Sequence, residues 1–274
     1  MLSLGVAACD SGGDSTQDVA FSSDTGDGVG SGDGNGDSDG DSGATDGGSA
    51  GQEGDSGSEE GGSSGDNGDS GSGDGNGNGN EGPIYAVGDS VLEFHIDEGG
   101  SIPEVAAEVA GYDVVNAALG GAMVLEGENR IPNQYEPGGW SWVIVEGGAN
   151  DLGDGCGCGD CMFVVDQLIS ADSSEGAMVE LLERIEADGH DILLAGYYRI
   201  PSNAEEFVEC SEEFEALNAR YEAYADSHDQ VVFVDMGVAM DGTDQSLYAE
   251  DLVHPSLAGS QAVGTLVGET ILAN

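Results

Sequence analysis

Residues 83–90 read PIYAVGDS, and this stretch sets the pattern from which the fold follows. A short apolar run ends at Gly88, where the residue types change to those of a turn. Runs of this length and composition are typical of strands that are buried on both faces of a parallel sheet. Similar runs recur at YDVVNAA (112–118), WSWVIVEGG (140–148), DILLAGYY (191–198) and VVFVDMG (231–237).

Helical patterns lie between these runs. Ser101 and Glu104 have the spacing of a capping box, and Gly111 stands where that helix should end. Apolar residues with helical spacing follow in two further segments, and a last helix is expected over 257–272. The alternation predicts an α/β protein, a three-layer α/β/α sandwich of the flavodoxin-like type with a mostly parallel five-stranded sheet. The two sets of spaced apolar residues are Met178, Leu181, Leu182 and Ile185, and Phe214, Leu217, Tyr221 and Tyr224.

The first part of the chain has a different composition. Residues 10–82 consist almost entirely of Gly, Ser, Asp, Asn and Glu. Such a segment cannot bury enough apolar surface to offset the entropy lost on ordering its backbone. We therefore expect a disordered acidic linker over 10–82 and a single catalytic domain over 83–274.

The residues ahead of this linker resemble a prokaryotic lipobox. Cys9 follows Val6, Ala7 and Ala8, which is the pattern of a lipoprotein signal that is cut before a lipid-bearing cysteine. The segment 1–9 departs from that pattern, because only eight residues precede Cys9 and none of them is basic. Either the start codon is assigned too late or the likeness is accidental. The tether that follows favours a lipid anchor at Cys9 and an extracytoplasmic location at the cell envelope.

The net charge of the chain limits which binding partners it can have. The chain has 55 Asp and Glu residues against four Arg and Lys, and its formal net charge is −51. The excess continues through the segments expected to fold, where self-repulsion destabilises a compact state unless salt screens it. We infer a high-salt or marine setting. Nucleic acid and anionic membrane surfaces are excluded as partners, since both would repel this chain.

The triplet Gly-Asp-Ser at 88–90 also occurs five times upstream, ending at serines of the linker. Only Ser90 follows a predicted buried strand, so only its hydroxyl would project from a turn above the edge of a sheet. A serine nucleophile also needs a base. His190 and His228 are expected at the surface, and His95 is a weak candidate. His254 is preferred, since Asp251 precedes it by three residues and can hold its ring.

Together these motifs resemble the SGNH/GDSL hydrolase family over residues 83–274. They are VGDS (87–90), VVNAALGGA (114–122), VEGGANDLG (145–153) and DLVHPS (251–256). The resemblance implies a nucleophile at Ser90 and a triad completed by Asp251 and His254. It further implies an oxyanion hole formed by the backbone N–H groups of Ser90 and Gly121 and by the side-chain amide of Asn150. Ala122 and Met123 replace the polar residues usual after the glycine, so Gly120 is an alternative to Gly121.

The implied reaction is ester hydrolysis through an acyl-enzyme, with neither metal nor organic cofactor. The substrate would be a small-molecule, lipid or carbohydrate ester. Transfer of the acyl group to a polysaccharide is an alternative, as is a non-catalytic, surface-tethered binding module. Pocket-lining candidates, for which packing in the core or rim is the competing interpretation, are Trp140, Trp142, Tyr197, Tyr198 and Arg199.

The remaining cysteines are candidates for two disulfide bonds. Cys156, Cys158 and Cys161 are close together, and Cys210 lies far downstream. Four thiolates could bind zinc, but an exported protein favours disulfides. A Cys156–Cys158 bond would close a very small ring, so we expect a member of the trio to join Cys210. That bond would tie the loop after Asn150 to the following helical region and hold one wall of the site.

Overall fold

The computed structural model describes residues 82–274. The expected lipid-bearing Cys9 lies outside these residues, as does all but the last residue of the expected linker 10–82. Within the described range, no helix has both the length and the apolar character needed to cross a bilayer.

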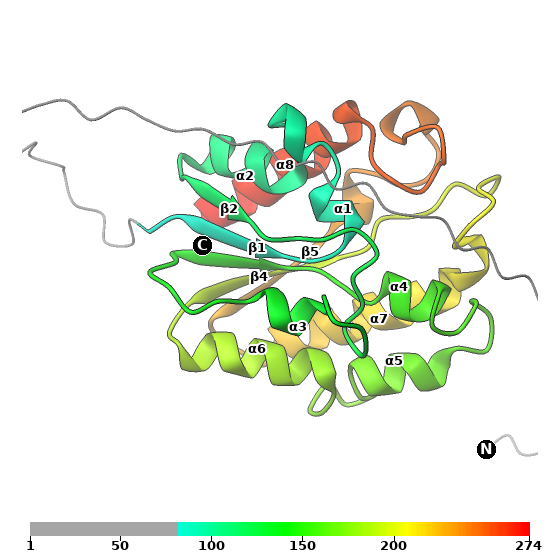
Figure 1. The fold of residues 1–274 in the computed structure, drawn as a ribbon, viewed down its shortest axis with the longest axis horizontal. Coiled ribbons are helices and arrows are strands. Elements are labelled where there is room, and N and C mark those ends of the chain that lie inside the picture. The colour runs from blue at the N-terminus through cyan, green and yellow to red at the C-terminus, as the bar shows by residue number, and fades with distance from the viewer. Residues whose placement is uncertain (1–81) are drawn as a thin grey trace, which may run out of the picture. The chain divides into compact units, whose positions relative to one another are not determined.

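A five-stranded parallel sheet forms the centre of the domain (Figure 1). The strand order is β2-β1-β3-β4-β5, and every pair of neighbours is parallel. This confirms the predicted fold class. The strands are β1 (Ile84–Val87), β2 (Val114–Asn116), β3 (Trp142–Val145), β4 (Asp191–Gly196) and β5 (Val231–Asp235).

Burial follows position in the sheet. All four residues of β1 and of β3 are buried, as expected for central strands. The expectation of burial on both faces is wrong for β2, where Val115 is 43% exposed. The reason is that β2 is an edge strand, which its apolar sequence does not reveal.

Helices cover both faces of the sheet (Figure 1). The helices α2 (Ile102–Ala110) and α8 (Leu257–Ala273) lie against one face, and α6 (Ala177–Ala187) and α7 (Ser211–Ala225) against the other. The capping box of Ser101 and Glu104 is present, and α2 ends at Gly111 as predicted. The other helices are short: α1 (Ser90–Glu93), α3 (Ile131–Gln134), α4 (Ala149–Gly153) and α5 (Met162–Leu168).

The apolar faces predicted for α6 and α7 point into the core, which is continuous through the sheet. At its carboxyl end, β1 is followed by a short turn and then α1. In the same way, β3 is followed by a short turn and then α4. In open sheets of this kind, ligands bind at that edge. The fold thus brings the residues after β1 and those after β3 to a common place.

Candidate active site

The turn after β1 is held by buried side chains. Asp89 caps α1, and its Oδ1 accepts a hydrogen bond of 2.9 Å from the N–H of Val91. The side-chain amide of Gln134 makes two hydrogen bonds to the backbone of Gly88. It accepts from the N–H at 2.8 Å and donates to the carbonyl at 2.9 Å. Ser90 is therefore the first residue of a helix whose preceding turn cannot shift freely.

The loop with His254 reaches the same place from the far end of the domain. The Nε2 of His254 lies 2.8 Å from the Oγ of Ser90, although 164 residues separate the two in sequence. Its Nδ1 lies 2.7 Å from the Oδ2 of Asp251. The sequence-predicted nucleophile, base and acid thus form one continuous hydrogen-bonded chain.

Asp251 also organises its own loop. Its Oδ1 accepts hydrogen bonds of 2.9 Å from the N–H groups of Val253 and His254. Partial burial opposes ionisation, but the hydrogen bonds from His254 and from these two N–H groups lower the pKa of Asp251 below its ordinary value. The carboxylate is therefore ionised at neutral pH and fixes the tautomer in which Nδ1 carries the proton.

One face of the His254 ring packs on an aromatic side chain. The rings of Phe94 and His254 are stacked, with centroids 4.6 Å apart and planes at 9°. His95 lies next to this pair, and its Nε2 is 3.1 Å from the carbonyl oxygen of Pro255. His95 thus contacts the backbone of the His254 loop and has no hydrogen bond to Ser90.

Two of the predicted oxyanion donors, Gly121 and Asn150, line the same cavity as Ser90. The N–H of Gly120 is already bonded to the Glu93 carboxylate at 2.8 Å, whereas that of Gly121 has no acceptor within residues 82–274. Gly121 adopts a φ of 71°, a left-handed conformation that side chains disfavour. The geometry therefore favours Gly121 over Gly120. Asn150 is buried, lines the same cavity, and donates one amide hydrogen to the carbonyl of Ala122 at 3.0 Å.

A cavity of about 270 Å³ opens over these groups. Of the five candidate lining residues, Tyr197 and Tyr198 border it. Trp140 instead stacks on Tyr85 with centroids 4.5 Å apart, and Arg199 lies 3.5 Å from Asp235. Trp142 is buried at the start of β3, which is the opposite edge of the sheet. An apolar wall completes the cavity and consists of Tyr198, Ile200, Phe207, Phe214 and Val253.

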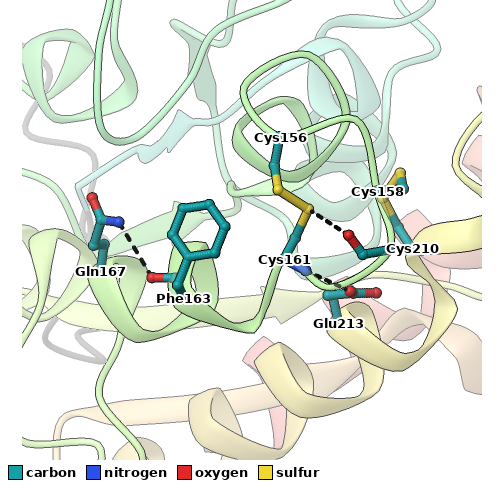
Figure 2. The surroundings of a disulfide bond; sticks show 8 residues. Cys156, Cys158, Cys161, Phe163, Gln167, Cys210 and Glu213 are labelled. Carbon is teal, nitrogen blue, oxygen red and sulfur yellow. Dashed lines mark hydrogen bonds between the residues drawn. A yellow bond between two sulfur atoms is a disulfide. The ribbon is translucent and has the colours of Figure 1, made fainter. Parts of the chain in front are cut away.

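The four described cysteines form two disulfide bonds, Cys156–Cys161 and Cys158–Cys210 (Figure 2). None of these sulfurs is a free thiolate, which removes the alternative zinc site built on them. The second bond joins the loop after α4 to the residue before α7, as expected for a bond to Cys210. The N–H of Cys210 donates to the carbonyl of Phe207 at 3.0 Å. The bond therefore anchors the segment that carries part of the apolar wall.

One of the two histidines predicted at the surface is buried instead. His190 is only 7% exposed, and its Nδ1 lies 3.0 Å from the carbonyl oxygen of Trp140. His228 is partly buried and stacks on Tyr224. Both histidines are far along the chain from the motifs, and neither lines the cavity.

Sequence reasoning missed one residue of the site, Glu146. It is fully buried beside Asp89, and the N–H of Asp89 donates to its Oε2 at 3.1 Å. Burial raises the pKa of Glu146 well above its ordinary value, and the neighbouring charge of Asp89 adds to the rise. The available signal was a lone acid at the end of an otherwise apolar strand, followed by two glycines.

Comparison with known proteins agrees with the fold. Residues 86–262 match the model of the GDSL-like lipase/acylhydrolase family. A search of curated proteins finds no match. Solved structures with the same fold include a member of the lipolytic protein G-D-S-L family from Veillonella parvula, with 16% identity and a TM-score of 0.53 over 70% of this chain and 98% of that one.

Two other structures are similarly related. A protein from Slackia heliotrinireducens, provisionally assigned as an SGNH hydrolase, has 21% identity and a TM-score of 0.51, covering 70% of this chain and all of its own. TesA has 23% identity and a TM-score of 0.50, covering 69% and 97%. At such identities the structures establish the fold, while the family model covers well over half of the sequence. The chain belongs to the GDSL-like lipase/acylhydrolase family and is an ester-hydrolysing enzyme.

Proposed function

We propose that Ser90, His254 and Asp251 are the catalytic triad of a serine esterase. The observation that carries the proposal is the chain of two short contacts, 2.8 Å from Ser90 Oγ to His254 Nε2 and 2.7 Å from His254 Nδ1 to Asp251 Oδ2. Ser90 and His254 both line the cavity. A nucleophile bonded to a base, and a base oriented by an acid, are the elements that acyl transfer requires.

In the first half of the reaction, Ser90 Oγ attacks the ester carbonyl carbon while His254 Nε2 takes the hydroxyl proton. The carbonyl oxygen becomes an oxyanion, and it accepts hydrogen bonds from the N–H groups of Ser90 and Gly121 and from the Asn150 amide. Collapse of the tetrahedral intermediate breaks the bond to the alcohol oxygen, which receives the proton from His254. The product is an acyl-enzyme on Ser90 and a free alcohol.

In the second half, His254 accepts a proton from water as the water oxygen attacks the acyl carbon. The same donors stabilise the second oxyanion. His254 then returns the proton to Ser90 Oγ as the carboxylic acid leaves. Throughout, the Asp251 carboxylate stabilises the positive charge of the doubly protonated ring.

The cavity favours uncharged acyl esters. Its wall is apolar, and the charged side chains that border it are the carboxylates of Asp89, Asp154 and Glu206, with His254 as the titratable base. An anionic substrate would meet repulsion there. A cavity of about 270 Å³ suits a small acyl ester, including an acetyl group on a sugar. Acyl transfer to a polysaccharide uses the same triad and differs in its acceptor.

The test is an assay of p-nitrophenyl esters with graded chain lengths in molar salt, with wild type and Ser90→Ala compared. We expect turnover on short esters that falls by about 10⁶-fold in the variant, the loss typical when a triad serine is removed. An equal rate in wild type and variant would overturn the triad. A non-catalytic binding module would show no turnover in either. Transfer of the acyl group to an added oligosaccharide in preference to water would favour the transferase.

We also propose that the protein acts outside the cytoplasm, tethered by lipid on Cys9. Two disulfides in a small domain support an oxidising compartment. The acidic composition supports work in concentrated salt, as argued above. Expression of the full chain and of Cys9→Ser in a bacterial host should leave the wild type in the detergent phase and the variant in the aqueous phase. Identical partition of wild type and variant would rule out the lipid anchor.

A further inference from the structure

Two carboxyl groups next to the nucleophile are almost fully buried. Asp89 is 1% exposed and Glu146 is 0% exposed. They come from the ends of neighbouring strands, β1 and β3, and the N–H of Asp89 donates to Glu146 Oε2 at 3.1 Å. A Cβ on Gly88 would lie 2.8 Å from the same Oε2, so this glycine is required for the carboxyl group to fit.

The two groups differ in how their oxygens are satisfied. Both oxygens of Asp89 accept a hydrogen bond, Oδ1 from the N–H of Val91 and Oδ2 from the hydroxyl of Tyr197, each at 2.9 Å. The Oε1 of Glu146 has no partner among the described residues. A buried negative charge is therefore far better supported on Asp89 than on Glu146.

The other groups that face this pair carry no positive charge of Arg or Lys. Three are tyrosine hydroxyls: those of Tyr197 and Tyr198, which follow β4, and that of Tyr221 on α7. The others are the carboxyl of Asp151 on α4 and the imidazole of His254, which both interact electrostatically with Asp89. Burial raises the pKa of all three tyrosines well above the ordinary value, so they are neutral. Two adjacent negative charges in such surroundings repel each other with little compensation.

We propose that Asp89 and Glu146 share one proton, held by Glu146, and that this buried pair positions Ser90 relative to Asn150. The inference rests on the proposed function. Tyr197 completes the link, because its hydroxyl accepts the N–H of Ala149 at 2.8 Å and donates to Asp89. The ends of β1, β3 and β4 are thereby joined through one network, and Ala149 directly precedes Asn150.

The proton on Glu146 matters for the reaction as well as for the fold. A second negative charge behind Ser90 would oppose the oxyanion that forms on its other side. It would also repel Asp89 and loosen the turn. Glu146 is thus a positioning residue whose neutral form is the active one.

The experiment compares Glu146→Gln, a neutral isostere, with Glu146→Ala. We expect the alanine variant to lose about 100-fold in kcat, as a misplacement of about 1 Å can cause, with KM little changed. The glutamine variant should recover to within about tenfold of wild type, since it retains the shape and the acceptor for Asp89 N–H. Near-ultraviolet circular dichroism shows whether each variant is folded.

Thermal unfolding gives a second readout that is independent of turnover. The pKa of Glu146 is raised in the folded state, so the stabilisation due to its bound proton is complete below the ordinary Glu pKa of about 4.3 and is lost as the pH rises towards the folded value. Glutamine does not titrate. The Tm of Glu146→Gln minus that of wild type should therefore increase by about 2–4 °C or more between pH 5 and pH 8.

The outcomes separate the two proposals. Two results would contradict the shared proton. One is a folded Glu146→Gln variant that is as inactive as the alanine variant. The other is a Tm difference that does not change with pH. Absence of Ser90-dependent turnover in wild type would overturn the esterase instead. In that case the pH dependence of Tm still decides whether Glu146 holds the proton.

Discussion

The turn that carries Ser90 and the loop that carries His254 meet at 2.8 Å, but they are held in different ways. The turn is anchored by buried side chains from distant parts of the chain, namely Gln134, Glu146 and Tyr197. The loop is held partly by its own residue Asp251, which bonds two N–H groups within three positions. It is also held by the Tyr198 hydroxyl, which donates to the carbonyl of Val253, and by the ring of Phe94. The Asp251 side chain is nevertheless 45% exposed. Substitutions in the turn should therefore lower stability as well as activity, whereas substitutions of exposed residues in the loop should lower activity alone.

The largest effect that separates the two regions is expected for Asp251→Asn. An asparagine keeps the size of the side chain but cannot stabilise the charged ring, and it favours the wrong tautomer. The kcat should fall by about 10⁴-fold. Because the Asp251 side chain is 45% exposed, Tm should change little, which differential scanning calorimetry will show. A loss of Tm as large as that of a core substitution would contradict the comparison.

The next largest effect on kcat is expected for Asn150→Ala, in the helix α4 that follows β3. This change removes one donor to the oxyanion and should lower kcat by about 10²–10³-fold. Asn150 also bonds Ala122, so the loop with Gly121 loses one anchor and Tm should fall slightly. Asn150→Asp serves as a matched control that keeps the size but removes the donor. An active Asn150→Asp would show that this amide is not part of the oxyanion hole.

Gly88→Ala is expected to have the smallest effect on kcat of these substitutions. It should nevertheless clearly lower the stability. Its Cβ would lie 2.8 Å from Glu146 Oε2 and 2.9 Å from a methyl group of Leu92. Overpacking of this kind costs about 1–3 kcal/mol. The matched control is Leu252→Gly in the His254 loop, where the φ of 60° suits glycine but the lost side chain is partly buried against the core. These two effects oppose each other, so a smaller change is expected. Equal urea midpoints for the two variants would contradict the proposed difference between the Ser90 turn and the His254 loop.

Sequence alone predicts most of what the two regions contribute. Apolar runs and helical spacing give the strands and helices, because each pattern is local. The order of Ser90, Asn150, Asp251 and His254 predicts a common site, because residues after parallel strands meet at one edge. The family resemblance added their roles.

What the sequence did not reveal depends on contacts between distant segments. Glu146 could not be identified from the sequence, because its buried partner Asp89 belongs to the turn after another strand. The burial of His190 depends on Trp140, and the half-exposure of β2 depends on strand order. The choice between Gly120 and Gly121 required the position of Glu93. None of these partners is close in sequence.

The bond between Cys158 and Cys210 has a consequence for the unfolded chain. It closes a ring across a separation of 52 residues, which encloses α5, α6 and β4. In the chain-entropy description, a crosslink over that span raises the free energy of the unfolded state by about 4 kcal/mol. Dilution of salt does not weaken a covalent ring, although it strengthens the repulsion among the acids. The crosslink therefore provides this domain with a reserve of stability when the ionic strength of its surroundings falls.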